Sequence, residues 1–341
     1  MVVDSLKKLD RDKVIKGLKE DTVKFASIPN AVKLWMNAWP SQHSNVDIIR
    51  ASGAYFLCPR EFVLNYWQPQ PNRSFDWNAY LKMNTGTFLH EYIQNCILGP
   101  MGVLYGKWHK FAENGIEIEE TTEGFHPDPE RAVHEIVTQK PLTYRYHEYN
   151  VWNTKYRMSG HLDGKLDIRR VNLLHKSLPL LKTNPEELCN RLHSTGSGDR
   201  FNLEIKTVSD YQFRKLETEK DIADYYKAQA CVYQKLSGIH KTVFWYIERN
   251  EMKSKVFVYD FEDGWWRDIQ RKATIVWRSI RDETLPESMM ACRLPTDKRA
   301  QGCAFKQPCW RNIDFKKYVE DGKVRAEKEN RKLLDLSKWE E

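Results

Sequence analysis

The sequence contains no long apolar run. Its 341 residues are 41% hydrophobic and 30% charged, and no stretch approaches the ~20 apolar residues that a membrane-spanning helix needs. The first residues, Met1 to Lys8, also lack the apolar core and small-residue cleavage site of a secretion signal. We therefore expect a globular protein without a membrane partner, located in the cytoplasm, or in the host cytoplasm if a virus encodes it.

A disulfide framework is not indicated either. The cysteines number seven, and an odd count without a secretion signal favours thiols or metal ligands. One cysteine stands early and three crowd near the C-terminus, namely Cys58, Cys292, Cys303 and Cys309. The scattered Cys96, Cys189 and Cys231 are interpreted as buried small hydrophobes.

The charge imbalance is modest. A net charge of +7 suits a polyanionic partner without establishing one. The 12 Trp, 16 Tyr and 14 Phe could stack on unpaired bases, although most such side chains belong to protein cores. There is no internal repeat and no long low-complexity tract.

Strands alternate with long helices along the chain. Helical patterns cover residues 52–67, 85–94, 219–236 and 265–281, and strand patterns cover 142–149, 156–168, 201–208, 242–248 and 255–261. The first 45 residues read as helical, residues 172–200 as an inserted loop, and the end beyond 313 as a solvated helix or frayed tail. This order predicts an α/β sandwich.

The segment Leu203-Glu204-Ile205-Lys206 lies in one of the expected strands. Side chains two residues apart share a face, so Glu204 and Lys206 point together while Leu203 and Ile205 enter the opposite, apolar layer. Phosphodiester hydrolysis uses such a pair: a carboxylate that holds Mg²⁺ or Mn²⁺, and a cation that orients water and offsets charge on phosphorus. By itself, such a tripeptide on a strand is far more often a solvent-facing ion pair.

Two upstream motifs offer metal ligands. Asp163 stands in a glycine-flanked turn or bulge, where a carboxylate can approach a metal, and Asp167 is the fallback ligand on the same strand parity. His90, in Gly86-Thr-Phe-Leu-His90, places an imidazole on the apolar side of a helix, which favours Mn²⁺ over Mg²⁺. Alone, these residues are also compatible with a turn aspartate and a core histidine.

A downstream helix supplies the last motif. Gln229 and Tyr233, at i and i+4, share a face with Tyr226 one turn earlier. They could hydrogen-bond a phosphate or the Lys206 ammonium, or form an ordinary half-buried helix face.

The order of these motifs resembles the RecB-like branch of the PD-(D/E)XK nucleases over residues 50–312. The resemblance implies a restriction-endonuclease-like core, with a central mixed β-sheet flanked by helices. It implies that His90, Asp163 and Glu204 bind Mg²⁺ or Mn²⁺, that Lys206 assists the attacking water, and that Gln229 and Tyr233 order the site. The forty residues between Asp163 and Glu204 exceed a simple connection between strands, which is a departure from the family pattern.

The split cysteines resemble those of RecB-like nucleases that carry a [4Fe–4S] cluster, including CRISPR-associated exonucleases. The resemblance implies that Cys58, Cys292, Cys303 and Cys309 form a four-cysteine metal-cluster subdomain from residues 52–67 and 285–312. Ten residues separate Cys292 from Cys303, where the family usually has two. Four thiolates also suit Zn²⁺, and unligated thiols remain an alternative. Five basic residues lie near these cysteines in the sequence and could bind a DNA backbone, or be ordinary solvated side chains: Arg60, Lys298, Arg299, Lys306 and Arg311.

The predicted organisation is an N-terminal helical segment (1–50), a nuclease domain (51–312) and a charged C-terminal tail (313–341). The resemblance implies a DNA exonuclease acting 5′→3′ on free ends in recombination or repair, with a single-strand annealing or recombination protein as a partner. The alternatives are an endonuclease of the same fold and a catalytically inactive DNA-binding scaffold.

Overall fold

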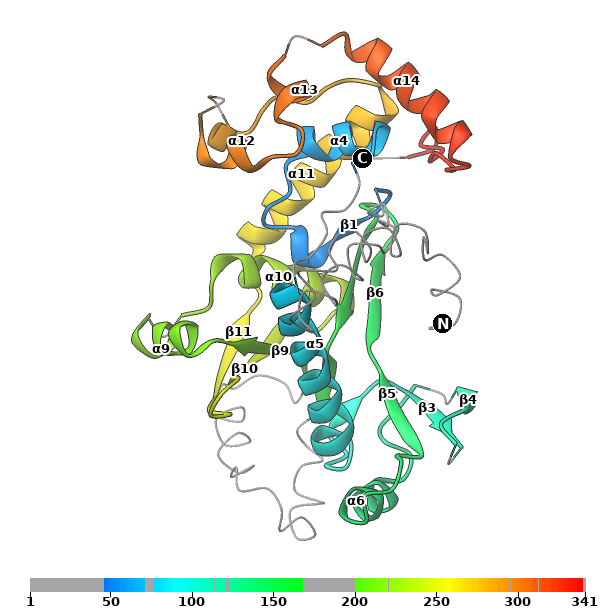
Figure 1. Cartoon of the computed structure of the whole chain (residues 1–341), viewed down its shortest axis with the longest axis vertical. Helices are drawn as coiled ribbons and strands as arrows, with labels where there is room; N and C mark the ends of the chain where they lie inside the picture. Colours follow the sequence, from blue (N-terminus) through cyan, green and yellow to red (C-terminus); the bar gives the residue numbers. More distant parts are fainter. Residues whose placement is uncertain are drawn as a thin grey trace, which may run out of the picture. The chain divides into compact units, whose positions relative to one another are not determined.

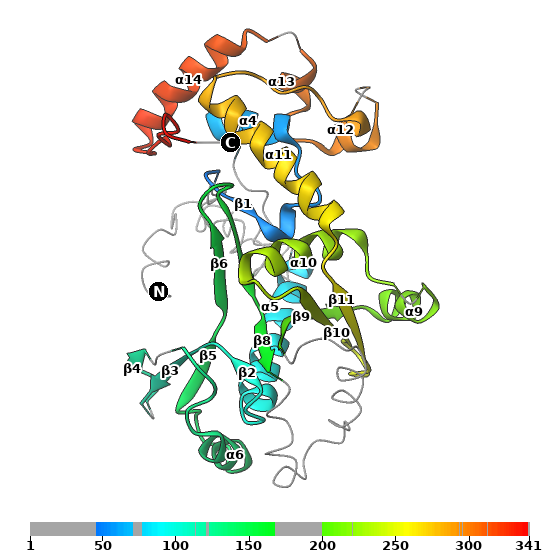
Figure 2. The same ribbon diagram turned by 180° about the vertical axis from the view of Figure 1, so that it is seen from behind.

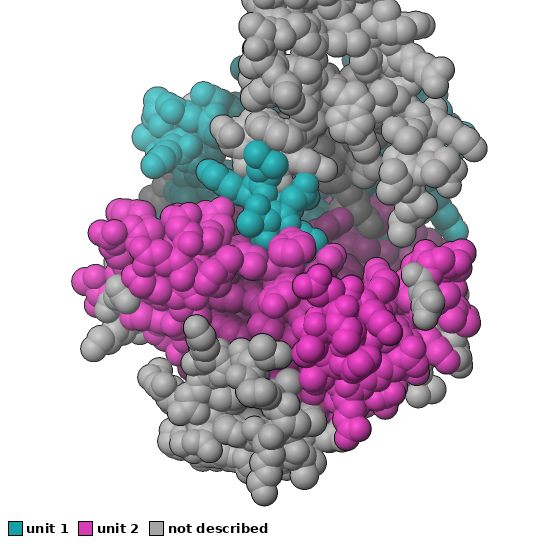
Figure 3. All heavy atoms as spheres, turned by 60° about the horizontal axis from the view of Figure 1, so that its bottom comes forward, with its two compact units in different colours: residues 1–46, 60–87, 287–334 teal, residues 47–59, 88–286, 335–341 magenta. Residues whose placement is uncertain are grey.

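The protein is described by a computed structural model, which covers residues 46–70, 77–112, 114–120, 123–167, 200–219, 221–292, 294, 296–311 and 313–339. The chain divides into two compact units, coloured teal and magenta in Figure 3. Unit 1 contains the described residues of 1–46, 60–87 and 287–334, and unit 2 those of 47–59, 88–286 and 335–341. The predicted N-terminal helical segment lies almost entirely outside the described residues, as does nearly all of the 172–200 insertion.

Unit 2 is built on a five-stranded sheet in the order β11-β10-β9-β8-β2 (Figures 1 and 2). Its strands are β2 (Leu104–Tyr105), β8 (Gly164–Asp167), β9 (Arg200–Val208), β10 (Lys241–Glu248) and β11 (Ser254–Asp260). Strands β9 and β10 run parallel and the other neighbours antiparallel, so the sheet is mixed. The α/β class with a mixed sheet flanked by helices is therefore confirmed.

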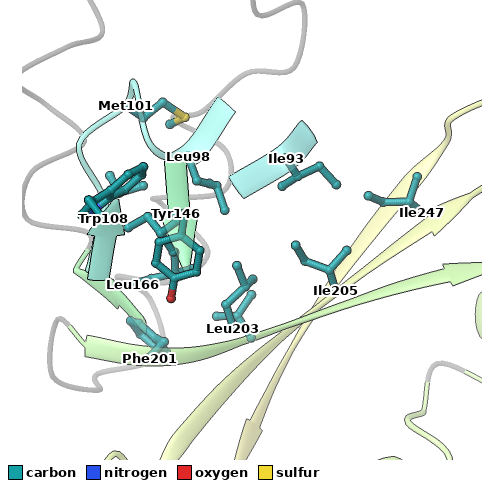
Figure 4. Packing of buried hydrophobic residues seen from close by; sticks show 13 residues of the cluster. Ile93, Leu98, Met101, Trp108, Tyr146, Leu166, Phe201, Leu203, Ile205 and Ile247 are labelled. Carbon is teal, nitrogen blue, oxygen red and sulfur yellow. The ribbon is translucent and has the colours of Figure 1, made fainter. Parts of the chain in front are cut away.

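One face of this sheet packs on a short π-helix, η2 (Ile93–Leu98), which continues α5 (Trp77–Tyr92). Leu203 and Ile205 of β9 point to this face and join Leu98 and Trp108 in a buried cluster (Figure 4). Leu203 is 1% exposed and Ile205 is fully buried. The predicted alternation of β9 is thus confirmed, because its apolar residues occupy one layer.

The opposite face packs on α9 (Asp210–Glu219) and α10 (Asp224–Ser237), with α11 (Asp263–Arg281) against α10. Phe244 and Tyr246 of β10 meet Phe213 and Ala230 of the helices in a second cluster. Helix α10 ends at Ser237, close to the predicted end at residue 236, and the following Gly238 has a φ of 72° that favours a residue without a side chain. The helix expected at 219–236 starts later than predicted, because Glu219 ends α9 and Ala223, with a non-helical ψ of 139°, is the N-cap of α10.

Two smaller sheets complete unit 2. The first has the order β1-β7-β6, from β1 (Ile49–Arg50), β7 (Met158–Leu162) and β6 (Tyr149–Asn153). The second has the order β4-β3-β5, from β4 (Glu117–Glu120), β3 (Lys107–Phe111) and β5 (Tyr144–His147). A 3-10 turn, η1 (Ala51–Gly53), follows β1, and α6 (Pro129–Val137) precedes β5. The sequence predicted β5, within the strand pattern at 142–149, but not β3, β4 or α6.

Unit 1 is helical in its described part. It contains most of α4 (Pro59–Trp67), with η4 (Met290–Cys292), α12 (Lys298–Gly302), α13 (Lys306–Trp310) and α14 (Phe315–Lys328). Helix α14 corrects the expectation of a solvated helix or frayed tail, since Val319, Gly322 and Ala326 are buried. A Cβ at Gly322 would lie 2.6 Å from the carbonyl oxygen of Trp67, so the glycine permits close packing on α4. No helix among the described residues is long and apolar enough to span a bilayer.

Candidate active site

Asp163 lies between β7 and β8 and is only 6% exposed. Its Oδ2 accepts a hydrogen bond from the backbone N–H of Ile205 at 2.6 Å, and its Oδ1 lies 3.3 Å from Nδ1 of His90. The Gln94 side chain donates to the backbone oxygen of Asp163 at 2.8 Å. The aspartate is therefore held by the neighbouring strand and by η2, with one carboxylate oxygen directed toward the imidazole.

His90 and Glu148 complete a compact group of possible metal ligands. His90 comes from α5, and Glu148 from the single residue between β5 and β6. One ligand atom from each of His90, Glu148 and Asp163 lies within 4.8 Å of the others. The sequence predicted His90 and Asp163 for this site, but it did not single out Glu148 or Gln94.

Glu204 and Lys206 form the second half of the site. Their side chains leave the same face of β9, and Lys206 Nζ donates to Glu204 Oε1 at 2.5 Å. Gln229 of α10 donates to the same oxygen at 3.2 Å and to the Tyr233 hydroxyl at 3.0 Å. The structure thus brings Gln229 and Tyr233 to the predicted strand motif.

Gly160 makes room for this arrangement. A Cβ at Gly160 would lie 2.3 Å from Cε1 of Tyr233 and 2.9 Å from Cβ of Ala51. Tyr233 can therefore pack against β7 only because residue 160 has no side chain. The chain bends at Asp163, beside Gly164, as predicted, and a Cβ at Gly164 would lie 2.4 Å from Cδ1 of Leu104, so this glycine also permits close packing within the sheet.

The electrostatics of the site show an accumulation of acids. Burial raises the pKa of Glu204, an effect that Lys206 opposes and Asp163 reinforces. Burial and the charge of Asp163 also raise the pKa of Glu148. Burial disfavours the imidazolium of His90, but the hydrogen bond to Asp163 and the charges of Asp163 and Glu148 outweigh it and raise the pKa of His90. Converging carboxylates of this kind are stabilised by a cation.

The compact group of His90, Glu148 and Asp163 fits a divalent metal ion, and Glu204, which is not part of that group, offers a further carboxylate oxygen. Glu204 Oε2 is buried and has no hydrogen-bond partner, whereas Oε1 is bound by Lys206 and Gln229. A buried carboxylate oxygen without a partner is costly unless a cation or water meets it. Carboxylate oxygens with one imidazole suit Mn²⁺ as well as Mg²⁺.

Asp167 is not brought into this group. It lies at the far end of β8, about 13 Å along the strand from Asp163 at ~3.3 Å per residue. There its carboxylate lies 3.7 Å from Nε of Arg200. The expectation that Asp167 could replace Asp163 as a ligand is therefore wrong.

The four predicted cluster cysteines are divided between the units. Cys292, Cys303 and Cys309 belong to unit 1, and Cys58 belongs to unit 2. In unit 1, the Arg60 guanidinium donates to the backbone oxygen of Cys309 at 3.0 Å, which joins α4 to α13. In this described region the three late sulfur atoms do not all lie within 4.8 Å of one another. Their ligation of a cluster stays a prediction.

Comparison with known proteins gave only distant similarity. No family model matches the chain, and no curated protein matches it. Solved structures similar to it include the alkaline exonuclease LHK-Exo from Laribacter hongkongensis, at 11% identity and a TM-score of 0.35, over 70% of this chain and 90% of that chain. The same exonuclease in complex with dAMP gives 12% identity, a TM-score of 0.35 and the same coverage. These values are too low to assign a family or an activity.

Proposed function

We propose that the protein is a metal-dependent nuclease that hydrolyses phosphodiester bonds in DNA. The observation that carries this proposal is the compact group of His90, Glu148 and Asp163, which the Ile205 N–H ties to the strand that bears the Glu204–Lys206 pair. The order of their motifs, which resembles RecB-like PD-(D/E)XK nucleases, supports the same function. The basic excess of the chain suits a polyanionic substrate.

The residues divide the chemistry between them. His90, Asp163 and Glu204 would hold Mg²⁺ or Mn²⁺, with Glu148 as a further ligand. When bound, the ion supplies positive charge that offsets the negative charge developing on the phosphate. Lys206, whose pKa Glu204 and Asp163 raise in spite of burial, stays protonated and would orient the attacking water and the phosphate. Gln229 and Tyr233 fix the Glu204 carboxylate.

Replacing the lysine tests this function. We expect Lys206→Met to reduce Mg²⁺- or Mn²⁺-dependent cleavage of end-labelled DNA by about 10²–10³-fold, the effect of losing one group that stabilises transition-state charge. Lys165→Met is the matched control, because Lys165 is also a half-buried lysine near a carboxylate, 3.9 Å from Glu123, but lies outside the site. Equal cleavage by the wild type and Lys206→Met would refute the assignment.

The mode of cleavage that we propose is exonucleolytic and 5′→3′, on free ends produced in recombination or repair. The support is the resemblance to the cluster-bearing exonucleases. Linear DNA labelled at either end should lose its 5′ label first, and closed circular DNA should stay intact. Cleavage of circles would favour the endonuclease alternative, and DNA binding without cleavage under any divalent ion would favour the inactive scaffold.

We also propose that Cys58, Cys292, Cys303 and Cys309 bind a [4Fe–4S] cluster. The three late cysteines all belong to unit 1, which supports this proposal. Further support comes from the hydrogen bond that Arg60, two residues after Cys58, donates to the backbone oxygen of Cys309. Anaerobically purified protein should contain iron and acid-labile sulfide and absorb visible light. Cys303→Ser should lose these signals and Cys96→Ser, the control, should keep them. Stoichiometric zinc without sulfide would show that the four cysteines bind Zn²⁺ and not an iron–sulfur cluster.

A further inference from the structure

A row of three aromatic rings extends from the candidate catalytic lysine. Lys206 Nζ lies 4.8 Å from the ring centroid of Tyr226. The Tyr226 and Tyr225 centroids are 4.1 Å apart, and those of Tyr225 and Phe56 are 6.0 Å apart with planes inclined by 30°. We call Phe56, Tyr225 and Tyr226 the aromatic row.

The fold holds this row in place from two chain segments. Tyr225 and Tyr226 stand in the first turn of α10, and Phe56 lies in the turn after η1, where its N–H donates to the Gly53 oxygen at 3.1 Å. The η1 turn packs on α10, and both views show this blue segment beside the helix (Figures 1 and 2). The neighbouring Tyr55 packs on Trp265 of α11, with centroids 5.7 Å apart.

Exposure increases along the row. Tyr226 packs on Phe244 and Tyr246 of the sheet, so it belongs partly to the core. Tyr225 is half-buried, and Phe56 is 52% exposed. Packing alone accounts for Tyr226. Phe56 also meets the Tyr55 ring edge-on, with centroids 4.9 Å apart, and its ring still offers exposed surface at the outer end of the stack that starts at the lysine.

We propose that Phe56 and Tyr225 determine substrate specificity by stacking on an unpaired nucleobase of the strand that is cut. This inference rests on the proposed nuclease function, because it requires a scissile phosphate near Lys206. Every base has a π-face, so aromatic stacking recognises single strands whatever their sequence. In a duplex those faces are covered by neighbouring base pairs. The preferred substrate is therefore single-stranded DNA or a frayed end.

Two substitutions at Phe56 test the proposal. Phe56→Leu keeps apolar bulk but removes the π-face, whereas Phe56→Trp keeps a π-face. We expect Phe56→Leu to lower kcat/KM on a single-stranded oligonucleotide about tenfold, within the range measured for loss of one stacked base, and to change duplex cleavage less than about threefold. Phe56→Trp should stay close to the wild type. Tyr211→Leu is the control, since Tyr211 is a 78% exposed aromatic residue on α9.

An abasic scan identifies direct stacking. Binding of end-labelled oligonucleotides, each with one abasic nucleotide, is measured by fluorescence anisotropy with Ca²⁺ replacing Mg²⁺. In the wild type, one abasic position should weaken binding about tenfold, and in Phe56→Leu that position should have no further effect. Equal losses in both proteins, or equal single-strand activity of Phe56→Leu and wild type, would overturn the stacking role while leaving the nuclease function intact. Absence of any metal-dependent cleavage by the wild type would instead refute the nuclease function.

Discussion

Replacing Gly160 by alanine should damage the site through Tyr233. The added Cβ would lie 2.3 Å from Cε1 of Tyr233, about 1.1 Å inside the 3.4 Å at which ordinary contact begins (3.4 − 2.3). Tyr233 is 3% exposed and hydrogen-bonded to Gln229, so its ring cannot move without shifting that side chain and Glu204. Overpacking of this kind costs about 1–3 kcal/mol, which exceeds the ~0.4–1 kcal/mol that a glycine-to-alanine change gains by restricting the unfolded chain.

The assay combines thermal unfolding with DNA cleavage. A loss of about 1–3 kcal/mol corresponds to a Tm lowered by roughly 2–12 °C for a unit of this size. Gly264→Ala is the control, because nothing lies within 4 Å of a Cβ at Gly264. In a Tyr233→Leu background, Gly160→Ala should cost at least about 0.5 kcal/mol less, since the clashing ring is gone. Equal Tm changes for Gly160→Ala in both backgrounds would refute the proposed clash.

Two further predictions concern the region of α6. Burial lowers the pKa of His126 to about 4, below the ordinary 6.5, and its Nδ1 accepts from the Asp128 N–H at 3.1 Å. The unfolded chain therefore takes up the proton first as the pH falls, so the free energy of unfolding should decrease by about 2 kcal/mol from pH 7.5 to pH 5. In urea unfolding of His126→Gln, the decrease over this pH range should be smaller by the same amount. Burial disfavours ionisation of Glu135, but bonds from Thr143 and Arg131 outweigh it and lower its pKa. The ionised Glu135 should therefore stabilise the fold above the ordinary pKa of glutamate, and this stabilisation should be lost as the pH falls through the lowered pKa. At pH 7, Glu135→Gln should lower the free energy of unfolding by about 1–3 kcal/mol in the same assay.

Local patterns in the sequence predicted the strand and helix that carry the motifs. The alternation of β9 identifies which side chains enter the apolar layer, because a strand has a strict period of two. The presence of α10 and its end just before Gly238 follow from helical spacing and a left-handed C-cap, although the helix starts later than predicted. Both are properties of neighbouring residues, so they can be inferred without knowing the tertiary structure.

The remaining parts of the site depend on contacts between distant segments. Glu148 occupies one residue between two strands, and only the folded chain shows that it meets His90 and Asp163. Gln94 carried a usable signal, since it stands four residues after His90 and shares its helix face. The transition from α5 to a π-helix at Ile93 was not predictable in this way, because it depends on packing against the sheet.

The register of two strands explains why both halves of the site meet. Gly164 of β8 pairs with Leu203 of β9 in antiparallel register, and one step further Asp163 lies opposite Glu204. Strand β9 therefore supplies the Glu204 side chain and, one residue later, the Ile205 N–H that binds Asp163. A slip of one residue would point Glu204 into the apolar layer and remove that N–H from Asp163. Burial of Leu203 and Ile205 in the apolar layer opposes such a slip, so close packing beneath the acids stabilises the geometry that their chemistry requires.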